Sequence, residues 1–149
     1  MKITQHIGFK LALLATLLFI ASLFLPAVEV TVLQKFVQFK GWQATRISLS
    51  LLTDLDKQPR LLLLSLAAMG NLAFPACLWL LCQARPRWAH IGALIVVAGC
   101  LALGLLAPTV LGSPQPTLLY GYHVWIGAFT LLLIAVLAEL KWGVVPAQN

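Results

Sequence analysis

Long stretches without Asp, Glu, Lys or Arg are the feature that most limits what this chain can fold into. Three such stretches cover residues 11–28, 61–84 and 88–138, and they are 18, 24 and 51 residues long. A helix that crosses a bilayer needs about 20 predominantly apolar residues. The first two stretches therefore match one span each, and the third is long enough for two. The sequence predicts four membrane-spanning helices.

The overall composition supports lipid as part of the solvent. Hydrophobic residues make up 61% of the 149 residues and charged residues only 9%, whereas a typical soluble domain is about 45–50% apolar and about 25% charged. A domain of this size buries roughly 70% of its unfolded surface, which is too little to hide so many apolar side chains. We therefore expect an all-α membrane protein, a four-helix transmembrane bundle, and not a water-soluble globule.

Charged residues and proline set the expected ends of these helices. We predict helices at about 10–28, 60–83, 88–110 and 118–140 within a single domain, 1–149. The segment GSPQP at 112–116 divides the longest stretch, because proline interrupts helical hydrogen bonding. The segment 29–59 is then an extracytoplasmic loop between the first two helices.

The basic residues exclude one class of partner and only weakly favour one orientation of the chain. The net charge is +6, yet the basic residues are scattered singly, so nucleic acid is not an expected partner. In the four-span arrangement the ten basic residues divide five to five between the two sides. Their placement beside the first helix and in the 85–87 connection favours an orientation with both termini on the cytoplasmic side. A cleaved signal peptide is the alternative for the first span, and Leu25 and Pro26 before a cut at Ala27 disfavour it.

The loop at 29–59 is the one segment long enough to fold outside the membrane. VEVTV at 28–32 alternates apolar and polar residues as a strand does, and β-favouring residues continue to Phe39, before a break at Gly41. The segment 47–55 fits either a strand or a helix. For the whole loop we favour one or two short strands followed by a short amphipathic helix at the membrane surface. Anchor-type side chains in this loop suggest contact with a partner; they are Phe36, Phe39, Trp42 and Arg46. The alternative is a small cap that packs on its own bundle.

Several kinds of chemistry have no matching residues. The three cysteines, Cys77, Cys82 and Cys100, all lie inside predicted helices, so loop disulfides for electron transfer and paired metal ligands are not expected. His90 and His123 lie near opposite membrane faces, which disfavours a haem between them. No acidic residue lies deep in a predicted span, and no catalytic set is visible. We therefore predict no cofactor, no metal and no enzymatic activity.

Asn71 is the polar residue that stands out, because it lies about halfway along the second predicted helix. A buried amide needs a hydrogen-bond partner, and Pro75 one turn later is expected to bend the helix and free the carbonyl of Asn71. We predict a ligand or packing site at Asn71 and Pro75, with His123 near it, and an interhelical hydrogen bond is the structural alternative to a ligand. Gly92 and Gly99 share one helix face and are expected to allow close approach of a neighbour.

Four short landmarks resemble a known family; they are FLPA at 24–27, GWQA at 41–44, GNLAFP at 70–75 and GYHVWIG at 121–127. Their order resembles a family of small uncharacterised bacterial inner-membrane proteins with four transmembrane helices, in which a GYYLW-like segment opens the fourth helix. Here His123 and Val124 replace the tyrosine and leucine. The layout is also similar to the tetraspan modules of paraquat-inducible-type lipid-transport proteins, although the cysteine motifs of those modules are absent. The first family implies a fold but no activity.

These features predict a non-enzymatic accessory or structural protein of the inner membrane that contacts other membrane proteins. Its expected partners are membrane lipid and either another membrane protein or a second copy of the chain. The alternative function is binding or transport of a lipid or other amphipathic molecule within the bundle.

Overall fold

The computed structural model describes residues 3–32, 35–50, 61–82, 87–110 and 117–142, which form five helices and three strands. In chain order the elements are α1 (Ile3–Phe24), β1 (Pro26–Val32), β2 (Lys35–Lys40), α2 (Gly41–Ser50), α3 (Leu61–Cys82), α4 (Arg87–Val110), β3 (Thr117–Leu118) and α5 (Tyr120–Trp142). The protein is therefore mostly helical with one small sheet, and the predicted single stretch 88–138 contains two helices.

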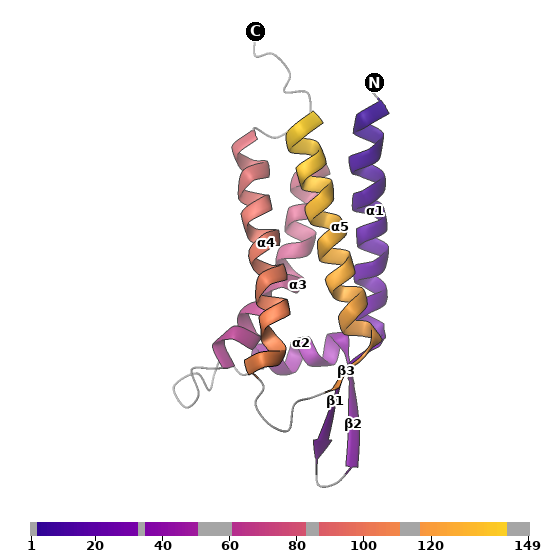
Figure 1. Cartoon of the computed structure of the whole chain (residues 1–149), viewed down its shortest axis with the longest axis vertical. Coiled ribbons are helices and arrows are strands. Elements are labelled where there is room, and N and C mark those ends of the chain that lie inside the picture. Colours follow the sequence, from indigo (N-terminus) through magenta and orange to yellow (C-terminus); the bar gives the residue numbers. More distant parts are fainter. Residues whose placement is uncertain (1–2, 33–34, 51–60, 83–86, 111–116, 143–149) are drawn as a thin grey trace.

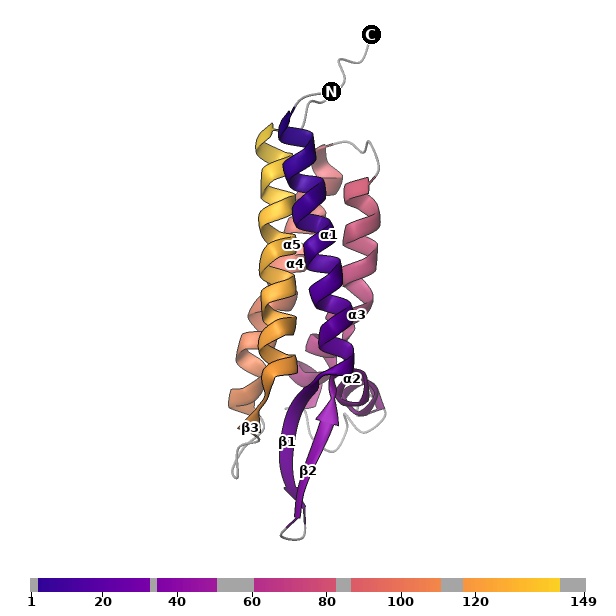
Figure 2. The ribbon, with the colours of Figure 1, turned by 90° about the vertical axis from the view of Figure 1, so that its right-hand side faces the viewer.

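Four long helices, α1, α3, α4 and α5, lie side by side (Figure 1, Figure 2). The main contacts join α1 to α5, α3 to α4, and α4 to α5. The N-terminal end of α1 and the C-terminal end of α5 lie at one end of this group of helices (Figure 1). The three strands and α2 lie at the other end, and we call these four elements the cap.

The first long helix differs from its predicted range of 10–28. It begins at Ile3 and ends at Phe24, and residues 26–28 belong to a strand. The reason is Pro26, which lacks an N–H group and disfavours the α conformation of the residue before it. The last helix also starts later than the predicted residue 118, because Thr117 and Leu118 pair with β1.

The cap contains a sheet in the order β2-β1-β3 with antiparallel pairs throughout. The strand predicted at 28–32 is confirmed, and the β-favouring residues up to Phe39 belong to a second strand, β2, which pairs with it in the antiparallel direction. The cap helix was expected at 47–55, but α2 begins directly after β2, at Gly41. The Gln43 side chain accepts a hydrogen bond from the Lys40 backbone N–H (3.0 Å), which is half of a capping box. Residues 51–55 of the predicted helix, and the predicted 112–116 turn, lie outside the described residues.

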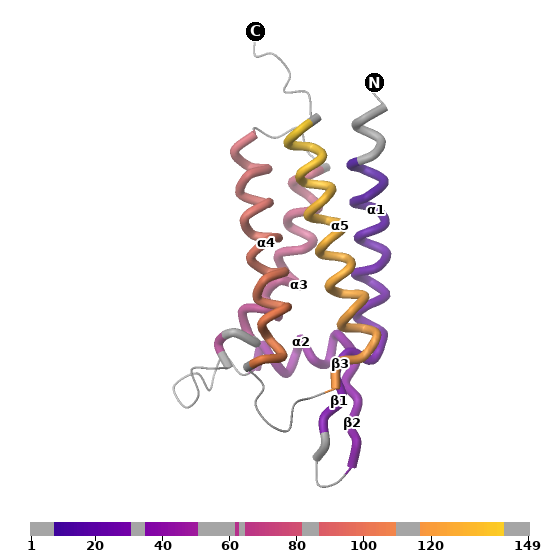
Figure 3. The backbone as a smooth tube through the Cα atoms, viewed as in Figure 1, coloured from indigo at the N-terminus to yellow at the C-terminus, as the bar shows by residue number. Residues whose placement is uncertain are grey.

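The helix α2 lies across the ends of the long helices (Figure 1, Figure 3). This close approach of the elements leaves no room for a side chain at Gly41 or at Gly121. A Cβ atom at Gly41 would overlap the backbone oxygen of Ser22 in α1, and one at Gly121 would lie 2.8 Å from the backbone oxygen of Leu25. Both contacts are with backbone, which cannot rotate away. Gly41 and Gly121 therefore allow α2 and α5 to approach the end of α1.

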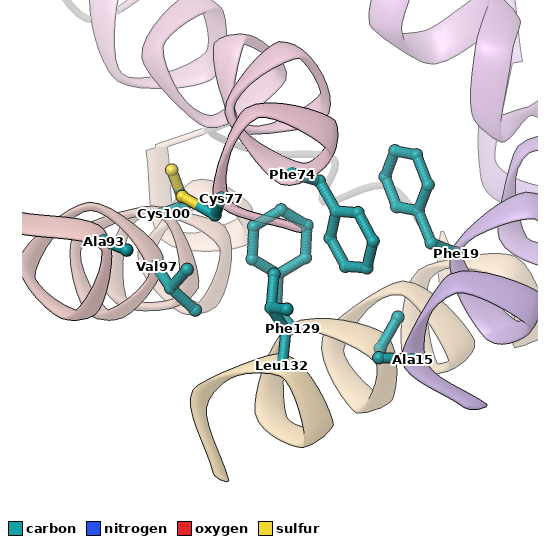
Figure 4. Close-up of a cluster of buried hydrophobic side chains, with 10 residues drawn as sticks. Ala15, Phe19, Phe74, Cys77, Ala93, Val97, Cys100, Phe129 and Leu132 are labelled. Carbon is teal, nitrogen blue, oxygen red and sulfur yellow. The ribbon is translucent and has the colours of Figure 1, made fainter. Parts of the chain in front are cut away.

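The core of the long helices is an aromatic cluster (Figure 4). Phe19 and Phe74 stack with their centroids 4.2 Å apart, and Phe129 contacts Phe74 edge-on at 5.2 Å. Cys77 and Cys100 are buried in this cluster as free cysteines. Gly92 and Gly99, however, are exposed, and no atom lies within 4 Å of a Cβ built at either position. The expected close approach at this face does not occur within the described chain.

Candidate functional site

A cavity of about 130 Å³ lies where the cap meets the long helices. Residues from all five helices, β1 and β3 line it, and most of them are Gly, Ala, Ser or Thr. None of the described residues that line it is charged. Small side chains on every side leave the space, and the absence of charge suits a neutral occupant because an unpaired charge is costly to bury.

One face of α2 closes the cavity on the side of the cap. Gly41, Ala44, Thr45 and Ser48 all line it, and they follow the spacing of a single helix face. Ser65 of α3, which is fully buried, donates a hydrogen bond to the Ser48 carbonyl (2.7 Å). These short side chains allow α2 to lie close to α3. They also leave the cavity open between α2 and the long helices, α3 included.

Asn71 is the centre of a hydrogen-bond chain that joins three helices. Its Nδ2 donates to the Thr45 hydroxyl (2.5 Å) in α2, and its Oδ1 accepts from Trp125 Nε1 (2.6 Å) in α5. The Thr45 hydroxyl in turn donates to the Gly41 carbonyl (2.9 Å). The half-buried amide thus has a partner for its donor and for its acceptor, and the chain links α2, α3 and α5.

A second polar contact joins α4 and α5 at the cavity wall. The Tyr122 hydroxyl donates to the Gly104 carbonyl (2.9 Å). In a regular helix this carbonyl would accept from the N–H four residues later, but that residue is Pro108, which has none. Tyr122 therefore satisfies an acceptor that proline leaves open. Gly104 also has to lack a side chain, because the Trp125 ring occupies the place of a Cβ there.

The three residues predicted for a ligand site separate in the structure. Asn71 lines the cavity, whereas Pro75 and His123 are exposed and do not line it. His123 contacts the Tyr122 ring edge-on, with centroids 5.5 Å apart. The sequence signalled that Asn71 needs a partner, but it gave no sign that Thr45 and Trp125 are those partners. Tyr122 and Trp125 were not among the predicted site residues, although both line the cavity.

The residues predicted for partner contact belong to two cap elements. Phe36 on β2 is 75% exposed and Trp42 on α2 is 43% exposed. Arg46 is exposed on α2, and Phe39 on β2 is half-buried. The hairpin formed by β1 and β2 points away from the ends of the long helices (Figure 1, Figure 2), and Phe36 lies near its tip.

The hairpin has two chemically different faces. Paired residues in antiparallel strands share a face, so the pairs Val28↔Phe39 and Val30↔Val37 form an apolar face. The opposite face carries Glu29 and Gln38, whose side chains are hydrogen-bonded (2.8 Å). Gln38 is exposed and the other five side chains are half-buried, so neither face is fully covered by the described part of the protein.

Comparison of the chain with protein-family models, with curated proteins and with solved structures finds no match. Within the described ranges, no group of three or more His, Cys, Asp and Glu side chains could hold a metal ion. The cavity, the hydrogen-bond chain and the hairpin are the features of this site that bear on function.

Proposed function

We propose that the protein crosses the bacterial inner membrane four times, through α1, α3, α4 and α5, with both termini in the cytoplasm. By length and composition, Arg87–Thr109 and Tyr120–Lys141 can each span a bilayer, and shorter apolar helices cover Gly8–Phe24 and Ser65–Leu81. Only 22% and 33% of the two longer windows is buried, which is low for core helices of a soluble protein. The bacterial family that the landmarks resemble supports the choice of membrane.

The exposed surface of the long helices supports lipid contact. Large apolar side chains are exposed on all four of them, among them Leu17, Leu72, Ile95 and Leu137. The charged side chains described on these helices lie near the end opposite to the cap; they are Lys10, Arg87, Glu139 and Lys141. Between that end and the cap, the helices offer an uncharged surface that matches the hydrocarbon layer.

Impermeant labelling tests the four spans and their orientation. With Cys77, Cys82 and Cys100 replaced by alanine, single cysteines at Phe36, Tyr120 and Trp88 are exposed reporters at the two ends of the helices. In intact spheroplasts, a membrane-impermeant maleimide should label the first two positions, and Trp88→Cys only after lysis. Labelling of all three positions in intact spheroplasts would contradict the proposal.

Within that membrane, the protein acts as a non-enzymatic accessory subunit whose cap contacts other membrane proteins. The observation that carries this function is Phe36, an aromatic side chain that is 75% exposed on a hairpin projecting past the helix ends. Because the hairpin extends away from the proposed spans, the exposed ring is accessible to a protein partner. Hydrogen bonds from Asn71 and Ser65 of α3 to α2 hold the cap in a fixed position, which lowers the entropic cost of binding.

Site-specific photo-crosslinking in native membranes tests this function. A photoreactive phenylalanine in place of Phe36 should give one protein adduct that copurifies in a fixed ratio. Tyr120 is a matched control, because it is aromatic, 79% exposed and at the same end of the helices but outside the hairpin. Lipid adducts alone, or the same protein adducts from both positions, would refute the assignment of the hairpin as the contact surface.

The cavity supports a second candidate function, the binding of a small neutral amphipathic molecule or part of a lipid. Its volume of about 130 Å³ and its uncharged lining are the specific observations in favour. Ala44→Leu would fill the cavity, and the expected result is loss of copurifying lipid in native mass spectrometry. Ala102→Leu, at an exposed position of α4 that does not line the cavity, is the matched control. Unchanged lipid retention in Ala44→Leu would exclude the cavity as the binding site.

A further inference from the structure

The outer edge of β2 is an unpaired strand edge in the described part of the chain. The sheet order β2-β1-β3 places β2 at the border, where β1 alone pairs with it. An edge strand presents backbone N–H and C=O groups that a further strand can pair with. Six residues, Lys35–Lys40, are long enough for such pairing.

The charges on β2 select the kind of strand that fits. Lys35 and Lys40 stand at the two ends of the strand, and both are exposed. Glu29 is the one carboxylate of the described hairpin, and it accepts a hydrogen bond from Gln38. Neither lysine has an ion-pair partner in the structure's described residues. An acidic residue opposite each lysine would therefore be favourable.

The same two lysines disfavour a second copy of β2 as the occupant. In an antiparallel pair of two such strands, Lys35 of each copy would face Lys40 of the other. Like charges directly opposite each other are destabilising, and edge lysines commonly oppose self-association of sheets. Charge complementarity thus favours a different protein with an acidic segment.

We infer that the outer edge of β2 binds an extended acidic segment of a partner protein by strand addition. This inference rests on the proposed function and specifies its partner. The antiparallel register defines six positions in the order acidic, apolar, polar, apolar, aromatic, acidic. The apolar positions meet Phe39 and Val37, the aromatic one meets Phe36, and the acidic ends meet the two lysines.

Peptide binding to the full-length protein in phosphatidylcholine nanodiscs tests the charge selection. A fluorescent peptide of this pattern should bind at least about tenfold more tightly than the same peptide with lysine at both ends, from two exposed ion pairs and removal of two repulsions. Lys35→Glu/Lys40→Glu should reverse this preference, and Lys35→Arg/Lys40→Arg should preserve it. An unchanged preference in the charge-reversed protein would overturn the inference.

A pair of N-methylated peptides tests the backbone pairing separately. Methyl groups on the alternate amides that face β2 should abolish binding, and methyl groups on the other edge should leave it unchanged. Equal binding of both peptides would overturn strand addition while leaving the Phe36 crosslinking result, and the accessory function, intact. Dimers of the protein that compete with the peptide would also overturn it, because the occupant would then be a second copy.

Discussion

The long helices and the cap differ in what holds them in place. The helices bury aromatic and small apolar side chains in one cluster around Phe19, Phe74 and Phe129. The cap helix α2 buries none of its side chains, and hydrogen bonds from Ser65 and Asn71 of α3 hold it against the long helices. Packing energy therefore dominates in one region and polar contacts in the other. Substitutions in the two regions should differ in size and in the part of the molecule that they loosen.

Removal of a core ring should have the largest effect. Phe129→Ala leaves a cavity between the rings of Phe74 and Trp125, and we expect a loss of about 4 kcal/mol in the free energy of unfolding. Reversible unfolding in detergent micelles measures this loss. Leu137→Ala on the same helix is the control, since Leu137 is 46% exposed and should lose less than about 1 kcal/mol. Equal losses would mean that the ring cluster is not the core.

A methyl group at Gly41 should have the next largest effect, and it should act on the cap. The added Cβ would overlap the Ser22 backbone oxygen, so α2 has to shift away from α1. We expect a loss of about 2 to 3 kcal/mol and faster hydrogen exchange in residues 26–50 than in the long helices. Gly127→Ala has nothing within 4 Å of its Cβ and is the matched control. Wild-type exchange in the cap of Gly41→Ala would contradict the close approach of α2.

Asn71→Leu should cost about 2 kcal/mol, because it leaves Trp125 Nε1 without its acceptor and Thr45 without its donor. Thr45→Val removes the other end of the same contact. If the hydrogen-bond chain acts as one unit, the double variant should lose less stability than the two single losses added together. Additive losses would show that Asn71 and Thr45 act independently. Helical circular dichroism should stay unchanged in all three variants.

Tyr122→Phe should have the smallest effect, about 1 kcal/mol, from loss of the hydrogen bond to the Gly104 carbonyl. The structure gives a specific reason for this bond, namely the missing N–H of Pro108. In a Pro108→Ala background the helix can supply its own donor, so Tyr122→Phe should then cost much less. The same cost in both backgrounds would refute the compensating role of Tyr122.

Local sequence signals were sufficient for much of the fold. The uncharged stretches predicted all four long helices, and alternation in VEVTV predicted β1, because each pattern depends on neighbouring residues. The sequence also indicated that Asn71 needs a partner. The start of α2 at Gly41 was missed, although Gln43 three residues after Lys40 is a recognisable capping signal.

The candidate site could not be predicted to the same extent. His123 was expected near Asn71, but its side chain is exposed. Trp125, two residues further along α5, donates the hydrogen bond to the Asn71 amide oxygen instead. A shift of two positions turns a side chain by more than half a helical turn. The rotation of each helix about its own axis therefore decides which of its residues meet at the cavity.

The sequence by itself determined the long helices and the strand segments of the cap, since hydropathy and strand alternation act over a few neighbouring residues. Only the tertiary structure decided the partners of Asn71, which lie 26 and 54 residues away along the chain. It also decided the pairing of β3 with β1 and the cavity between the cap and the helices. These contacts depend on how separate elements pack, and a hydrogen bond forms only where packing brings donor and acceptor within about 3 Å.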